Sequence, residues 1–159
     1  MQPVSRALDE MKKEEYKNLL EKELIKNSED ALSAMKATIA ALPEKSKHLY
    51  FEIFTSQDRD GFFSIRANLD GPDLYVLNKA IDNVADIFDP KFINGELKPF
   101  IPTTANPFKI EYELNDVAVD CAAKWLSELW KQLDSNSVSV PVSIVGHDDY
   151  GTTTPITLK

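Results

Sequence analysis

The chain has 159 residues, 43% hydrophobic and 28% charged, a composition typical of one globular domain and not of a disordered chain. Acidic residues outnumber basic ones by 26 to 18, which gives a formal charge of −8. This charge argues against a nucleic-acid backbone and an anionic membrane surface as partners, because both attract clustered Lys and Arg. It favours a basic protein partner, steered to the surface by its field.

The N-terminal sequence, MQPVSRALDEMKKEEYKNLL, has no apolar segment of signal-peptide length. No segment approaches the ~18 consecutive apolar residues of a membrane helix. A single cysteine, Cys121, excludes an intramolecular disulfide and a cysteine-based zinc site. We therefore expect a cytoplasmic protein with one domain over 1–159, in which 1–10 are either native or an added extension, because Met11 could also serve as a start residue.

Residues 9–42 have apolar side chains at helical spacing, and Pro43 ends the pattern. Asn27 and Ser28, followed by two acidic residues, have the composition of a helix N-terminus, where free N–H groups and the helix dipole favour such side chains. The segment is therefore predicted to be either one long helix or two helices joined near residue 27.

The next segment, HLYFEIFTSQDRDGFFSIRANLDG (48–71), has two runs of aromatic and β-branched residues around a polar turn, which predicts a β-hairpin. Asp58, Asp60 and Gly61 occupy the third, fifth and sixth places of an EF-hand loop that would start at Ser56. The twelfth place, however, is Ala67, where calcium binding needs a bidentate Glu. We therefore interpret this segment as a turn and predict no metal site and no cofactor.

Residues 72–88 have an apolar stripe with spacings of 3 and 4, which predicts a helix that Asp89 and Pro90 end. Asp82 and Asp86 are four residues apart on the opposite side, and Asp89 follows three residues later. Like charges at this spacing repel by a few tenths of a kcal/mol. The row is either a docking stripe for a basic partner or a solvated face.

The connection over 89–107 contains five prolines or glycines, and we expect a long loop pinned over the core by Phe92, Ile93, Phe100 and Ile101. The alternation in FKIEYEL (108–114) predicts a strand. Residues 116–133 have a broad apolar arc that includes Cys121 and predict a helix packed on more than one neighbour.

The C-terminal segment predicts a second hairpin, with Val138, Val140, Val142 and Ile144 on one face. Pro141 lacks a backbone donor, so its strand is predicted to be an edge or to contain a bulge. The sequence GHDDYG (146–151) offers His147, Asp148 and Asp149, and we interpret it as a hairpin turn, because adjacent residues rarely converge on one ion.

These elements predict an α+β fold, an antiparallel sheet of about five strands (two hairpins plus one strand) with helices packed mainly on one face. The sequence has no nucleophile elbow, no Gly-rich phosphate loop, and two histidines, His48 and His147. We therefore favour a protein that is not an enzyme, although abundant carboxylates leave acid–base chemistry open.

The leading hypothesis for function is a small acidic binding protein, an immunity protein that neutralises a basic bacterial toxin such as a nuclease by occluding its cleft. The candidate partner-binding residues are Asp82, Asp86, Asp89, Asp58, Asp60, Asp148 and Asp149. Two alternatives are a small enzyme with a pocket under the 89–107 loop, and an adaptor domain that self-associates through the Pro141 strand or Trp130. The oligomeric state is left open.

Overall fold

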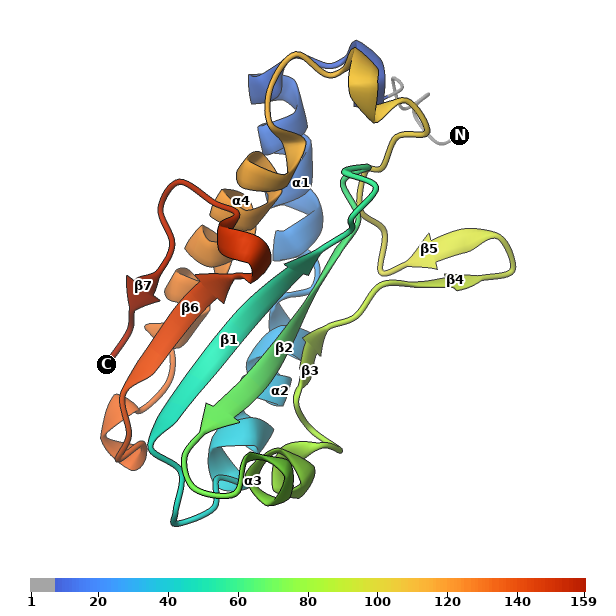
Figure 1. Ribbon diagram of the computed structural model, residues 1–159. Helices are drawn as coiled ribbons and strands as arrows, with labels where there is room; N and C mark the ends of the chain where they lie inside the picture. The colour runs from blue at the N-terminus through green and yellow to red at the C-terminus, as the bar shows by residue number, and fades with distance from the viewer. Residues whose placement is uncertain (1–7) are drawn as a thin grey trace.

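The computed structural model describes residues 8–159, which form four α-helices, a five-stranded sheet and a separate two-stranded hairpin (Figure 1). The prediction of an α+β fold with five strands in the sheet is confirmed. The helices are α1 (Lys13–Ile25), α2 (Ser28–Ala40), α3 (Leu74–Ile81) and α4 (Leu114–Trp130). The strands are β1 (His48–Thr55), β2 (Phe63–Asp70), β3 (Asp86–Phe88), β4 (Lys91–Ile93), β5 (Glu96–Lys98), β6 (Val142–Gly146) and β7 (Ile156–Thr157).

The main sheet has the strand order β3-β2-β1-β6-β7 and is mixed. β1 pairs with β6 in parallel, with Leu49 opposite Val142, whereas the other three pairs are antiparallel. The predicted antiparallel sheet is therefore wrong for one pair, since β1 and β6 run parallel, and the sheet is mixed and mostly antiparallel. β6 also lies between β1 and β7, so it is not an edge strand, and Pro141 precedes the first residue of β6 and does not interrupt it.

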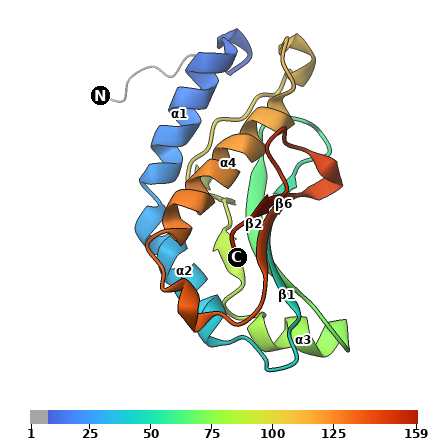
Figure 2. The same cartoon turned by 90° about the vertical axis from the view of Figure 1, so that its left-hand side faces the viewer.

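Helices α1, α2 and α4 lie on one side of the sheet (Figure 2). Along β1, Leu49, Phe51 and Ile53 point toward these helices and are buried, while the alternate residues are partly exposed. We call the side of the sheet away from α1, α2 and α4 the open face. Its side chains include His48, Tyr50, Glu52 and Phe54 from β1, Ser64, Arg66 and Asn68 from β2, and Ser143 and Val145 from β6.

The hydrophobic core lies between the sheet and the three helices. α1 and α2 are separate helices that meet at residues 26–27, which is the second of the two predicted arrangements. Cys121 is buried on α4, and burial raises the pKa of its thiol to about 12. The helices contribute Tyr16, Leu20, Leu24, Ala31, Met35, Ala118, Ala122, Leu126 and Leu129 to this core. Trp130 is buried as well, so it offers no surface for self-association.

The predicted helix over 72–88 is wrong beyond Ile81. Residues 86–88 instead form β3, which pairs with β2 and buries Phe88. Backbone bonding explains the difference, since Ala67 N–H donates to Ala85 O at 2.8 Å and Thr38 Oγ1 donates to Val84 O at 3.0 Å. These tertiary hydrogen bonds outweigh the helical spacing of the apolar residues.

Two further segments differ from their predictions. Residues 108–114 form no strand, because a 3₁₀ turn occupies Pro107–Lys109 and α4 already begins at Leu114. The connection over 89–107 is not a plain loop, because β4 and β5 pair as a hairpin that projects from the body (Figure 1). None of the helices within residues 8–159 combines the length and apolarity that crossing a bilayer requires. The proposed extension 1–10 lies mostly outside the described residues, although Leu8 is buried.

Candidate partner-binding surface

The seven predicted aspartates lie in three separate places and do not form one cluster. Asp82 directly follows α3, Asp86 is the first residue of β3 and Asp89 directly follows β3, whereas Asp58 and Asp60 lie in the turn between β1 and β2. The remaining pair, Asp148 and Asp149, forms part of a 3₁₀ turn, His147–Asp149, directly after β6. The structure therefore separates residues that the sequence analysis had considered together.

Arg66 on β2 holds the first two aspartates. Its Nη2 lies 2.7 Å from Asp82 Oδ1, and its Nη1 lies 2.5 Å from Asp86 Oδ1. Lys79 Nζ lies 3.8 Å from the other oxygen of Asp82. The predicted repulsion between the two aspartates is thus countered by a cation from a neighbouring strand, which the helical model of 72–88 did not include.

Asp89 is also paired with a basic side chain, since Lys91 Nζ lies 3.3 Å from its Oδ2. Each carboxylate of the predicted row therefore has a basic neighbour. A partner's Lys or Arg would have to share these carboxylates with side chains of the protein itself, which weakens the row as a docking stripe.

The turn between β1 and β2 has the hydrogen bonds of a tight turn. Asp60 Oδ1 accepts from Phe62 N–H at 3.0 Å, Ser56 Oγ accepts from Asp58 N–H at 3.1 Å, and Arg59 has a positive φ of 57°. These local bonds are what Asp and Ser side chains supply in turns. Among residues 8–159, no three His, Cys, Asp or Glu side chains gather as a metal site would need.

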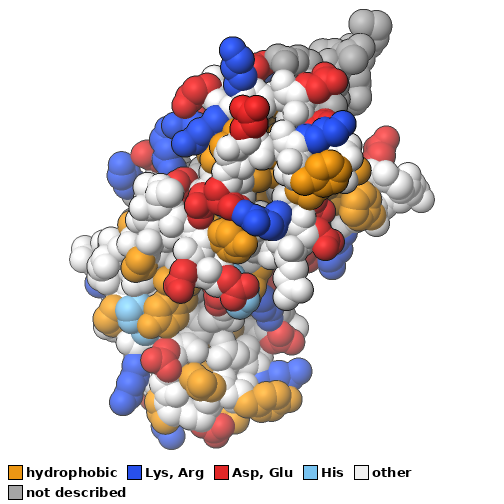
Figure 3. Space-filling view, turned by 45° about the horizontal axis from the view of Figure 1, so that its top comes forward, with side chains coloured by type: hydrophobic (Ala, Val, Ile, Leu, Met, Phe, Trp, Pro, Cys, Tyr) orange, Lys and Arg blue, Asp and Glu red, His pale blue; other side chains and the backbone are white. Residues whose placement is uncertain are grey.

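A second set of polar contacts lies on the open face and includes both histidines of the chain (Figure 3). His147 Nδ1 lies 2.8 Å from Glu52 Oε2, and Asn68 Nδ2 donates to Glu52 Oε1 at 2.8 Å. The His147 ring also packs against Phe54, with centroids 5.0 Å apart. Glu52 therefore anchors the turn that presents Asp148 and Asp149 at this end of the open face.

At the other end of β1, His48 Nε2 lies 2.9 Å from Ser143 Oγ, and the His48 ring stacks on Tyr50 with centroids 4.1 Å apart. Such a His–Ser pair could activate a nucleophile if the hydroxyl were accessible. Ser143, however, is only 8% exposed. We therefore interpret this hydrogen bond as a structural contact that joins β1 to β6 and not as a catalytic pair. Sequence analysis missed this network, although the alternation of His48, Tyr50 and Glu52 was a signal that these side chains share a face.

A hollow of about 390 Å³ lies beside the open face, between β2 and α3. Arg66 and Asn68 line it from the sheet, and Lys79 and Asp82 line it from the helix side. Leu74 and Tyr75, in the first turn of α3, also line it, and Tyr75 is 78% exposed; the neighbouring Val76 is exposed as well. Apolar side chains beside paired charges are typical of a protein-binding surface.

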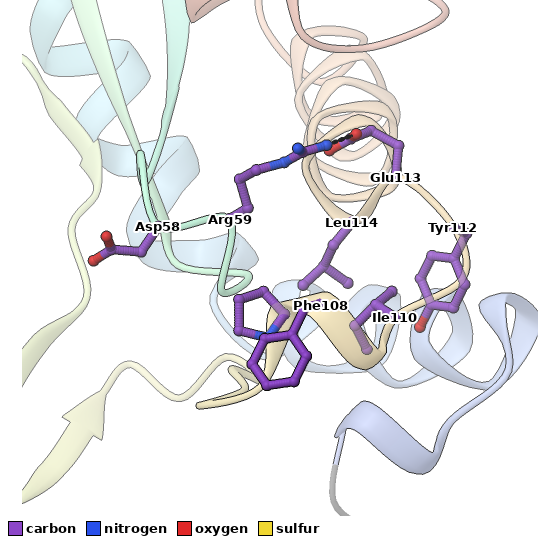
Figure 4. Close-up of a pocket in the computed structure, with 8 residues that line it drawn as sticks. Asp58, Arg59, Phe108, Ile110, Tyr112, Glu113 and Leu114 are labelled. Carbon is purple, nitrogen blue, oxygen red and sulfur yellow. Dashed lines mark hydrogen bonds and ion pairs between the residues drawn. The ribbon is translucent and has the colours of Figure 1, made fainter.

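A second hollow, of about 320 Å³, lies at the turn between β1 and β2, and we call it the turn pocket (Figure 4). Phe108, Ile110, Tyr112 and Leu114 supply its apolar walls. Arg59 reaches across from the turn to form an ion pair with Glu113. Burial raises the pKa of Tyr112, and the nearby Glu15 adds to this effect. Among residues 89–107, Pro107 alone lines this pocket. The turn pocket is therefore not the pocket that was predicted beneath the 89–107 loop.

Fold and surface together define an α+β domain whose mixed sheet is covered by helices on one side and presents polar and acidic side chains on the other. The chain belongs to a family described as "Family of unknown function (DUF6389)", whose model matches residues 11–159. No curated protein and no solved structure matches the chain. The geometry of its surfaces is therefore the basis for a functional proposal.

Proposed function

We propose that this protein binds a basic protein partner on the open face of its sheet, and that it is an immunity protein that neutralises a basic bacterial toxin, such as a nuclease, by occluding its cleft. The observation that carries the proposal is the open face itself. Helices cover the other side of the sheet (Figure 2), whereas this side has carboxylates in the turn after β6 and at its β3 margin, and an exposed apolar turn of α3 beside it.

The charges of this surface favour a basic partner. Glu52, Asp82, Asp86, Asp148 and Asp149 supply five carboxylates, against the two basic side chains of Arg66 and Lys79. The side chains of Asp82 and Asp86 remain 52% exposed despite their ion pairs, and that of Asp148 is 64% exposed. Such carboxylates raise the association rate of a cationic partner, and this effect weakens as salt increases.

The exposed apolar residues of α3 would supply the rest of the contact. Leu74, Tyr75 and Val76 are each more than half exposed, and Leu74 and Tyr75 line the hollow together with Asp82. Tyr side chains frequently act as anchors at interfaces, because a large rigid ring is buried at little entropic cost. In this proposal Tyr75 slows dissociation, while the carboxylates accelerate association.

The test begins with capture of partners from lysate and culture medium of the source strain, with washes at low and high salt and identification by mass spectrometry. A single basic protein identified in this way is then purified, and its binding is measured by surface plasmon resonance. We expect the double variant Asp148→Lys/Asp149→Lys to slow association about tenfold at low salt and to flatten its salt dependence.

The matched control is Glu14→Lys/Glu29→Lys, which changes the net charge equally on the helices of the other face. It should alter association much less. Equal slowing by both double variants would show that net charge and not the open face governs binding, and the proposed surface would then be wrong. Asp82 and Asp86 are better tested as Asn variants, because Lys at either position would also repel Arg66.

A further inference from the structure

The turn pocket has walls that suit an aliphatic or aromatic group. Phe108 is 80% exposed, and Ile110 and Leu114 line the same hollow (Figure 4). Its volume of about 320 Å³ lies at the small end of the range for ligand sites. A pocket of this size accepts a single long side chain or a small organic molecule.

The charged groups of the pocket favour a cation. Asp58 and Glu113 supply two carboxylates against the single guanidinium of Arg59. Arg59 Nη2 donates to Glu113 Oε2, whereas Glu113 Oε1 is buried and accepts no hydrogen bond from any residue within 8–159. The Asp58 carboxylate points away from the apolar walls, so Glu113 is the carboxylate that lies on their side of the pocket (Figure 4).

We propose that the turn pocket binds a guanidinium group on an aliphatic stem, which is the chemistry of an arginine side chain. This inference rests on the proposed function, since the basic partner would supply the arginine. The stem would pack on Ile110 and Leu114, the planar cation would stack on the exposed Phe108 ring, and Glu113 would accept from it beside Arg59. The pocket thus adds a second contact, at the turn between β1 and β2, to the open face.

The probe is N-acetyl-arginine amide, titrated into the ¹⁵N-labelled chain and followed by NMR. We expect a saturable change, in the millimolar range, confined to amides of residues 57–61 and 108–114. N-acetyl-citrulline amide, which has nearly the same shape without the charge, is the matched control and should bind about tenfold more weakly. Equal binding of citrulline amide, preferential binding of an N-acetyl-aspartate amide, or changes outside the pocket would overturn the proposal.

Three variants locate the binding groups. Glu113→Gln should weaken arginine amide about tenfold, because it removes the charge of the acceptor. Phe108→Ala should weaken it several-fold, and this substitution of an exposed ring leaves the core intact. Asp148→Asn, outside the pocket, should change nothing. Wild-type affinity in both pocket variants would show that the cation binds elsewhere.

This test and the test of the proposed function can fail separately. Arginine amide is a defined probe, so its binding to the turn pocket is measured without any partner. If the probe fails while charge reversal at Asp148 and Asp149 still slows a partner's association, the pocket proposal is wrong and the open face stands. If the probe binds but no basic partner exists, the pocket remains a guanidinium site and the immunity function falls.

Discussion

Arg66 Nη1 on β2 lies 2.5 Å from Asp86 Oδ1 on β3, and this ion pair joins the edge strand to the sheet. The other guanidinium nitrogen contacts Asp82, just past the end of α3. One cation therefore connects strand, strand and helix at the margin of the open face. Because the Asp side chains are 52% exposed, water screens each ion pair and each contributes little to stability alone. The arrangement stabilises the fold mainly because one cation offsets the repulsion between two anions.

Replacing Arg66 with Met keeps an aliphatic stem and removes the cation. We expect the free energy of unfolding to fall by about 1 kcal/mol, because Asp82 and Asp86 then repel each other without compensation. Urea denaturation measures the change. Adding Asp86→Asn should recover part of the lost stability, because it removes one of the two repelling charges. Lys79→Met should lower the free energy of unfolding by less than about 0.5 kcal/mol, because the Lys79 nitrogen lies farther from Asp82 than the Arg66 guanidinium does. No recovery in the double variant would mean that the Arg66 stem, not its charge, matters.

Gly61 and Gly95 form a matched pair for testing close packing at the turn. Both have positive φ, +94° and +82°, but a Cβ at residue 61 would lie 2.9 Å from Pro102 O, whereas residue 95 has no neighbour within 4 Å. Gly95→Ala should cost about 1 kcal/mol from backbone strain alone. Gly61→Ala should cost at least about 1 kcal/mol more. Equal thermal denaturation midpoints would show that the 102–104 segment yields freely to the added methyl group.

Asp120 on α4 anchors the segment after β6 and predicts a pH dependence of stability. Burial alone would raise its pKa, but hydrogen bonds from the side chains and backbone N–H groups of Thr152 and Thr153 outweigh burial, and its pKa is lowered. A lowered folded-state pKa stabilises the protein above the unfolded pKa of about 4, and this contribution is lost as pH falls through the folded value.

Asp120→Asn should therefore be less stable than the wild type at pH 7, and the difference should shrink as pH is lowered below about 4. Urea denaturation at several pH values measures both chains. The control is Glu111→Gln, which removes an exposed carboxylate outside this network. The gap in stability between this variant and the wild type should not change between neutral and acid pH as it does for Asp120→Asn. A constant gap between wild type and Asp120→Asn at all pH values would contradict the assignment.

Cys121 should react slowly with thiol reagents in the native protein. It is buried on α4, and its pKa of about 12 leaves little thiolate at neutral pH. Ellman's reagent should react at least a hundredfold faster in urea than in buffer, on the order expected for a protected thiol. The control is Glu128→Cys in a Cys121→Ser background, an exposed position on the same helix that should react rapidly in both conditions. Rapid native labelling of Cys121 would indicate that α4 opens locally.

Local sequence patterns correctly predicted the helices and strands in which buried residues recur at regular spacing and whose packing partners are close in the sequence. The alternation over 63–69 and the helical spacing over 13–40 both match buried faces in the structure. The segment 72–88 failed because its spacing suits a helix, whereas the hydrogen bond from Ala67 N–H to Ala85 O depends on a strand elsewhere. No local pattern records such a bond.

The candidate sites were less predictable than the fold. Acidic residues were visible in the sequence, but the cation of Arg66 between Asp82 and Asp86 depends on the register of β2 against β3. The turn pocket was invisible for a similar reason, because Arg59 and Glu113 are 54 positions apart and meet only when α4 begins at Leu114. The predicted strand over 108–114 would have placed alternate residues on opposite faces of a sheet.

The parallel pairing of β1 with β6 has a consequence for how the chain acquires its structure during synthesis. β1 lies at the centre of the sheet, yet one of its neighbours begins only at Val142. Until that segment leaves the ribosome, the edge of β1 that β6 will occupy is unpaired, and such an edge invites association with other chains. Closing the long loop between β1 and β6 is also entropically costly, so we expect this pairing to be a late and slow step of folding.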